Sequence, residues 1–194
     1  MAEKSLDVIK TRELGGTPEA EKIRALVVRK SEEHWLPLSS LLLASIARYE
    51  HTENLIKPAL AAGKIVLSDR YADSTYVYQV LQQGADENAF RQLYALTLGD
   101  FKPDLTLVFD LPTEISIIRA RTDVQIELFK ERASEKASDR FEQTSTETQE
   151  KVRQAYLDIA KNNPDRCVVV NAAQDVDKVA DDVWTIVKER LNLS

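Results

Sequence analysis

The 194-residue sequence has very few of the residues from which disulfides and structural metal sites are built. It contains one cysteine, Cys167, and two histidines, His34 and His51, which lie far apart. A single cysteine cannot form an internal disulfide, and so few ligand residues argue against a structural zinc site. Cys167 lies in an apolar, strand-like run at residues 166–170. We therefore expect it to be a buried, small apolar residue in a chain suited to a reducing cytoplasm.

The sequence also lacks a charged-then-apolar leader and any long apolar run. These absences support neither secretion nor a transmembrane helix, so we expect no membrane partner. The formal net charge of −6 argues against a nucleic-acid or membrane-surface binder, because such proteins need a positive field. A few arginines inside a cleft could still bind a small anion.

Glycine is scarce as well, with five residues in the whole chain. The only Gly-Lys pair is Gly63–Lys64, which is followed by Ile65 and has no suitably spaced glycine before it. The sequence therefore contains no phosphate-binding loop of the form G-x-x-x-x-G-K-[ST], the motif that holds the phosphates of ATP in many kinases.

Short apolar runs alternate with helical patterns along the chain, and this alternation predicts an α/β fold with a parallel sheet flanked by helices. We expect one domain over residues 1–194. Thr17 followed by Pro18 predicts a helix start, Pro58 a bend or restart within a helical region, and Gly99 a helix end. The expected strands are residues 7–11, 65–68, 105–110 and 167–170.

The most informative stretch is residues 64–79, K-I-V-L-S-D-R-Y-A-D-S-T-Y-V-Y-Q. An apolar strand ends there in Asp69 and Arg70, and the carboxyl ends of strands are where open α/β sheets bind ligands. Ser74, Tyr78 and Gln79 follow at helical spacing and can face the same site. A buried strand with a solvated charged end is the alternative for an isolated Asp-Arg pair, but the intact pattern D-R-Y-x-x-S-x-x-x-Y-Q favours a site.

Five segments in order resemble the thymidylate kinase family, whose members move the terminal phosphoryl group of ATP to dTMP. Residues 11–17, T-R-E-L-G-G-T, resemble the family's T-R-E-P-G-G-T, and residues 47–60 resemble its acceptor-site helix. Residues 69–79 resemble its D-R-Y/H signature, residues 103–107 its P-D-L-T-L strand, and residues 139–142 the end of its lid. The resemblance covers nearly the whole chain and implies the fold of P-loop nucleoside monophosphate kinases.

The resemblance also implies roles for particular residues. Arg48 and Arg70 would hold the acceptor's phosphate, and Asp69 would help to place Mg²⁺. Glu13 would help to shape the acceptor site. The residues that would face the sugar and base are Ser74, Thr75, Gln79 and Tyr78, although a core role for Tyr78 is an equal alternative.

The lid, expected at about residues 119–142, would bring Arg140 to the transferred phosphoryl group. A lid arginine lowers the barrier by stabilising charge that grows in the transition state. Arg119 and Arg121 would either support Arg140 or be solvated surface groups, and for Arg132 we favour the surface. We interpret His51 as a packed helix residue rather than a catalyst, because nothing near it in the sequence orients it.

Three departures from the family stand out. The missing phosphate-binding loop leads us to interpret the chain as a kinase shortened at its N-terminus, which would leave strands 65–68 and 105–110 without their shared neighbour. Ala44 stands where the family commonly has a phenylalanine that stacks on thymine, and Leu14 replaces the family's turn proline. A non-catalytic relative that binds a nucleotide monophosphate or a protein is the alternative function. The apolar helix around residues 41–46 is compatible with a homodimer, and equally with core packing.

Overall fold

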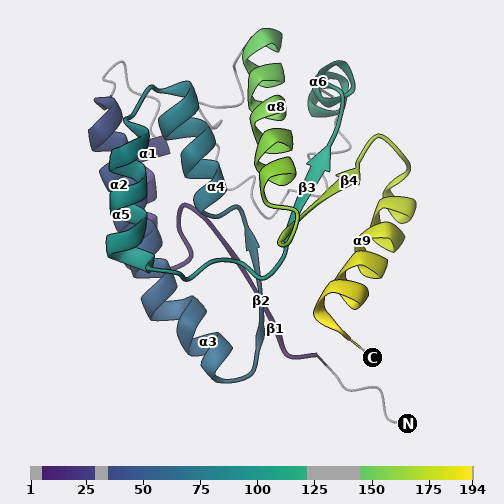
Figure 1. Cartoon of the computed structure of the whole chain (residues 1–194), viewed down its shortest axis with the longest axis horizontal. Coiled ribbons are helices and arrows are strands. Elements are labelled where there is room, and N and C mark those ends of the chain that lie inside the picture. Colours follow the sequence, from purple (N-terminus) through teal and green to yellow (C-terminus); the bar gives the residue numbers. More distant parts are fainter. Residues whose placement is uncertain (1–5, 29–34, 122–144, 194) are drawn as a thin grey trace. The chain divides into compact units, whose positions relative to one another are not determined.

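A computed structural model describes residues 6–28, 35–121 and 145–193 (Figure 1). The chain divides into two compact units, Met1–Phe101 and Lys102–Ser194. The prediction of one domain over residues 1–194 stays a prediction.

The first unit contains one parallel pair of strands and a group of helices. In chain order its elements are β1 (Val8–Arg12), α1 (Pro18–Val28), α2 (Pro37–His51), the π-helix η1 (Thr52–Ile56), α3 (Lys57–Ala61), β2 (Ile65–Asp69), α4 (Ala72–Thr75), the π-helix η2 (Tyr76–Gln82) and α5 (Glu87–Leu98).

Helix boundaries in this unit follow the expected local signals. The Thr17 hydroxyl accepts a hydrogen bond from the Ala20 N–H and so caps α1. Pro58 occupies the first turn of α3, and the helix before it widens into η1, whose looser hydrogen bonding accommodates the missing proline N–H. Gly99 ends α5 with a φ of 60°. The predicted helix start, restart and stop are all confirmed.

The register of the β1–β2 pair decides where the site can lie. Val8 pairs with Ile65 at one end and Arg12 pairs with Asp69 at the other, so both strands point their carboxyl ends the same way. The purple and blue strands run side by side in Figure 1. The apolar cores beside them are formed by Ile56, Tyr71, Ala72 and Leu98, and by Leu41, Val80 and Ala85.

The second unit has the same plan on a smaller scale. Its described elements are β3 (Thr106–Asp110), α6 (Thr113–Arg121), α8 (Thr146–Asn162), β4 (Cys167–Asn171) and α9 (Val176–Leu191). β3 and β4 are parallel, and α8 and α9 flank them in Figure 1. Cys167 is buried with Val108 and Ala160, as the sequence predicts.

The described strands form two separate parallel pairs, β1 with β2 and β3 with β4. The predicted α/β class with parallel strands is therefore confirmed, and no described strand joins β2 to β3. Leu67 on β2 and Phe109 on β3 are both more than half exposed. In the described parts of the chain, no helix is long and apolar enough to cross a membrane.

Candidate functional site

The carboxyl ends of β1 and β2 bring two of the predicted motifs together. The Glu13 N–H donates to the Asp69 carbonyl at 2.9 Å, which extends the strand pairing by one residue. Because β1 and β2 are parallel, the loop after β1 and the Asp69–Arg70 pair at the end of β2 lie at the same edge. This is the edge at which parallel sheets bind ligands.

A buried ion pair forms the centre of this edge. Arg48 Nε donates to Glu13 Oε2 at 2.8 Å, and the two side chains are 3% and 2% exposed. Arg48 Nη2 also donates to the hydroxyl of Thr75 on α4. The loop, α2 and α4 therefore fix one guanidinium group, and a rigidly held guanidinium suits an oxyanion such as phosphate.

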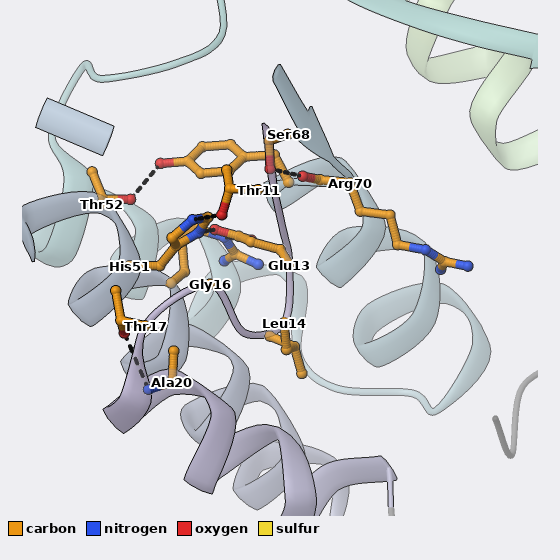
Figure 2. Close-up of polar contacts among 12 residues, drawn as sticks. Thr11, Glu13, Leu14, Gly16, Thr17, Ala20, His51, Thr52, Ser68 and Arg70 are labelled. Atoms are coloured by element: carbon orange, nitrogen blue, oxygen red, sulfur yellow. Dashed lines mark hydrogen bonds and ion pairs between the residues drawn. The ribbon is translucent and has the colours of Figure 1, made fainter. Parts of the chain in front are cut away.

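His51 lies directly beside this pair, at the end of α2, and is completely buried. Its Nε2 is 2.6 Å from the Thr11 hydroxyl, and its Nδ1 is 3.5 Å from Glu13 Oε1. Figure 2 shows the Thr11, Glu13 and His51 side chains converging where the loop passes Gly16. A Cβ on Gly16 would lie 2.5 Å from His51 Nε2, so only glycine permits this close approach.

Helix α1 holds the other side of the loop. The Glu21 carboxylate accepts hydrogen bonds from the Arg12 guanidinium and from the Gly16 N–H, and Arg24 donates to the Leu14 carbonyl. Burial raises the pKa of the Glu21 carboxyl, but the Gly16 N–H and the Arg12 guanidinium outweigh it and hold that pKa below its ordinary value. The loop is thus fastened at both ends by charge-assisted contacts.

Tyr71 supports the pair from the core. Its ring lies under the Arg48 guanidinium, 5.6 Å from centroid to carbon, and its hydroxyl lies 2.8 Å from that of Thr52. Burial raises the pKa of the Tyr71 hydroxyl, so this side chain is neutral and acts by packing.

Arg70 occupies the outer part of the edge. Its backbone has a positive φ of 72°, and the Ser68 hydroxyl donates to its carbonyl at 2.8 Å. The guanidinium lies over the Tyr78 ring at 5.2 Å, and Figure 2 shows it pointing away from Glu13. A non-glycine residue at such a φ is strained, and strain of this kind is concentrated at functional sites.

Comparison with known proteins shows which family the chain resembles. The family model described as thymidylate kinase matches residues 1–183. The chain belongs to the thymidylate kinase family. It is 42% identical over 183 residues to a thymidylate kinase from Pseudomonas putida F1, covering 94% of this chain and 81% of the relative. It is 43% identical over 177 residues to one from Dinoroseobacter shibae, covering 91% and 80%.

A solved structure agrees with the sequence relatives. The crystal structure of thymidylate kinase from Ehrlichia chaffeensis resembles this chain with a TM-score of 0.67 at 31% sequence identity. The match covers 94% of this chain and 80% of that one. The predicted P-loop nucleoside monophosphate kinase fold and the predicted family are therefore both confirmed.

Within this thymidylate kinase framework, the predicted site residues fall into two groups. Glu13, Arg48 and Thr75 are in direct contact, whereas Arg70 contacts Tyr78 further out. Tyr78 is half-buried rather than a core residue. The remaining predicted residues differ in exposure: Gln79 is buried, Ser74 is half-buried and Asp69 is exposed.

The lid arginines are only partly within the described structure. Arg119 donates to the carbonyls of Ala172, at 2.7 Å, and Gln174, so it ties α6 to the segment after β4. Arg121 ends α6, and Arg132 and Arg140 lie outside the described residues. The lid prediction for residues 122–142 therefore lies outside them too.

His51 is packed, as the sequence interpretation expects, and no neighbour in the sequence orients it. The two residues that do so, Thr11 at the end of β1 and Glu13 in the loop after it, lie about 40 positions earlier in the chain. Thr11 and Tyr71 belong to two of the predicted motifs but were given no role of their own, and Thr52 was not singled out. A usable signal existed, because Thr11 and Glu13 share one side of a strand and Arg48 and His51 share one face of a helix.

Two further expectations concern the Ala44 position and metal binding. Ala44 is completely buried in α2, so the position at which the family commonly has a stacking ring carries a packed methyl group. Among the described residues, no group of three or more acidic, histidine or cysteine side chains could hold a metal ion alone.

Proposed function

We propose that this chain transfers the γ-phosphoryl group of ATP to dTMP, forming dTDP for nucleotide biosynthesis, as a single kinase domain. The observation that carries the proposal is the buried Arg48 guanidinium, fixed by Glu13 and Thr75 at the carboxyl edge of β1 and β2. Phosphoryl transfer needs positioning and charge neutralisation more than covalent chemistry, and a fixed guanidinium supplies both.

In this proposal two arginines approach the acceptor phosphate from different sides. Arg48 does so from the interior, where its orientation is set before the substrate arrives. Arg70 does so from the exposed end of β2, where its long side chain can leave the Tyr78 ring. The acceptor's sugar and base then lie toward Ser74, Thr75, Tyr78 and Gln79, which share the α4–η2 segment.

Asp69 fits the proposed contact with Mg²⁺. It offers a carboxylate, the oxygen ligand that Mg²⁺ prefers, at the end of β2 beside Arg70. Mg²⁺ commonly takes one or two carboxylates and keeps water and substrate phosphates as its other ligands, so a larger protein cluster is not needed. When bound, the ion neutralises charge on the transferred phosphoryl group.

The lid completes the proposal. Arg140, supported by Arg119 and Arg121, would approach the transferred group when the lid closes over the site. Arg119 already fastens α6 to the Ala172 and Gln174 carbonyls, which supports a role for it in aligning this part of the chain. The lone, buried Cys167 supports our proposal of a cytoplasmic location.

Two measurements separate acceptor binding from turnover. The first is calorimetric titration of this chain with dTMP, with dUMP and dCMP as competitors that test base preference in the presence of Ala44. The second is phosphotransfer from Mg-ATP to dTMP by this chain, with a version beside it that carries the family's first strand and phosphate-binding loop. We expect both proteins to bind dTMP and to turn over, the extended one faster because its added loop would hold the phosphates of ATP. Binding of dTMP without turnover by either protein would contradict the proposal and favour the non-catalytic relative.

We also propose that the kinase forms a homodimer through one face of α2. Leu38, Leu42, Ile46 and Tyr49 recur at spacings of three or four residues, and each is at least 40% exposed. Leu41 and Ala44 are completely buried on the opposite side of the helix. The stretch at residues 41–46 therefore serves the core with one face and leaves an apolar stripe on the other, which a second copy would cover.

Light scattering after size-exclusion chromatography tests the dimer. We expect Ile46→Glu to convert a dimer to a monomer, because it places a charge in the stripe. Leu96→Glu is the matched control, since Leu96 on α5 is even more exposed, at 81%, and lies outside the stripe. A monomeric parent protein, or equal dissociation by both variants, would rule out this interface.

A further inference from the structure

We propose that His51 is a positioning residue whose Nδ1–H faces Glu13 and holds that carboxylate in the orientation that fixes Arg48. The inference deepens the proposed function, because Arg48 is the group on which that proposal rests. His51 contacts Thr11 and Glu13, and of these Glu13 is the partner of Arg48, so the effect of His51 on Arg48 would pass through Glu13.

The proton's place on the imidazole follows from its two neighbours. A threonine hydroxyl can donate or accept a hydrogen bond, whereas a carboxylate can only accept one. If Nδ1 carried a lone pair, that lone pair would face the lone pairs of Glu13 Oε1 inside the protein. A proton on Nδ1 removes the repulsion and leaves Nε2 to accept from the Thr11 hydroxyl, 2.6 Å away.

Two buried atoms without a hydrogen-bond partner support this assignment. Among the described residues, Glu13 Oε1 and His51 Nδ1 are both buried and both lack a hydrogen bond. They face one another across 3.5 Å. A shift of about 0.5 Å would bring them to an ordinary N–H···O distance, and buried polar groups rarely stay unpaired. Contacts of this kind are often long without substrate and tighten when it binds.

Glu13 can transmit the orientation because its two oxygens have different tasks. Oε2 accepts from Arg48 Nε at 2.8 Å, and Oε1 faces His51. Rotation of the carboxylate would move both oxygens together, so a contact on Oε1 also fixes Oε2. The imidazole itself cannot turn easily, because Thr11 lies at one edge and the Gly16 backbone lies close beside it, as Figure 2 shows.

Three substitutions separate the two edges of the imidazole. In His51→Asn the amide nitrogen takes the place of Nδ1, so a donor toward Glu13 is kept. In His51→Gln the amide nitrogen takes the place of Nε2, so only the contact with Thr11 is kept. His51→Leu removes both. Ser45→Ala is the control, because Ser45 is also buried on α2 and loses one hydrogen bond, to the Leu41 carbonyl, without touching Glu13.

The direct readout is the Arg48 Nε–H signal in an NMR spectrum of protein with ¹⁵N-labelled arginine. A buried Nε–H bonded to a carboxylate gives a shifted signal that exchanges slowly with water. We expect this signal in the parent protein, in S45A and in H51N, and its loss or marked shift in H51Q and H51L. We expect the dTMP affinity of H51Q and H51L to fall about tenfold and that of H51N to stay close to the parent.

The outcomes distinguish this inference from the proposed function. A parent protein that keeps the Arg48 signal but does not bind dTMP overturns the proposed function, while the signal still decides the role of His51. An unchanged signal in H51L, or a signal kept in H51Q and lost in H51N, overturns the positioning role. If H51L does not fold, the comparison of H51N with H51Q still decides, because both keep a polar amide at the same position.

Discussion

Arg48 Nε and Glu13 Oε2 lie 2.8 Å apart, although both side chains are almost completely excluded from solvent. Moving two charges out of water is costly, and their attraction repays the cost only when the geometry is good and further hydrogen bonds are made. Thr75 and the Tyr71 ring supply such support on the arginine side. We therefore interpret the Arg48–Glu13 pair as an arrangement that fixes the orientation of the guanidinium, rather than as one that adds to the stability of the fold.

Substitution of Arg48 by methionine should separate the cost of the pair from its function. R48M leaves the Glu13 carboxylate buried without its cation, so we expect the free energy of unfolding in urea to fall by about 3–5 kcal/mol. The double variant E13Q/R48M removes both charges and should recover most of that loss. Neither variant should bind dTMP. If the double variant is no more stable than R48M, the loss of stability in R48M does not come from the unpaired, buried charge of Glu13.

Gly16 offers a second test, with another glycine of the chain as its control. Gly16 and Gly63 both have positive φ angles, 91° and 76°, so alanine at either position adds backbone strain of about 1–2 kcal/mol. A Cβ at Gly63 meets nothing within 4 Å, whereas at Gly16 it meets His51 and Thr11 at 2.5 and 2.6 Å. Gly16→Ala should therefore destabilise the protein by about 2 kcal/mol more than Gly63→Ala in urea unfolding. Equal losses would mean that the loop can move away from His51 without cost.

The sequence was sufficient wherever a signal is local. Thr17 and Pro18 mark a helix start by their own chemistry, Gly99 marks a helix end, and the apolar run before Asp69 marks a strand. The motif at residues 69–79 likewise indicated one part of the candidate site, since its residues are neighbours in the chain and one of them, Thr75, contacts Arg48.

The sequence was insufficient wherever a role depends on a contact between distant segments. His51 acquires its environment from Thr11 and Glu13 only when α2 packs against the loop after β1. The two π-helices, η1 and η2, were also missed, because a helical pattern does not distinguish a tight turn from a wide one. Their presence changes which side chains share a face, so the spacing of Ser74, Tyr78 and Gln79 does not by itself decide which of them face the same site.

The Glu21 carboxylate predicts a dependence of stability on pH. Its pKa in the folded protein lies below the ordinary value of 4.5. A lowered folded pKa means that Glu21 contributes stability above about pH 4.5, and that this contribution is lost as the pH falls through the folded pKa. In urea unfolding from neutral pH to about pH 3, the parent protein should therefore be more stable than E21Q at neutral pH and converge on it in acid. A constant difference between the parent and E21Q would contradict the role of the carboxylate charge.

The positive φ of Arg70 predicts that glycine at this position would make the fold more stable than alanine would, while both substitutions would weaken dTMP binding. Arg70→Ala and Arg70→Gly remove the same guanidinium and the same contact with Tyr78, but only alanine keeps the backbone strain at a φ of 72°. The free energy of unfolding in urea should therefore be about 1 kcal/mol higher for the glycine variant than for the alanine variant. This difference already allows for the extra conformational freedom that glycine has in the unfolded chain. Both should lose dTMP affinity to the same extent, which calorimetry would measure. An alanine variant as stable as the glycine variant would show that the Ser68 hydrogen bond and its surroundings relieve the strain. If the difference is found, the chain keeps a strained arginine where glycine would fold better, and such a residue persists when its side chain serves the ligand.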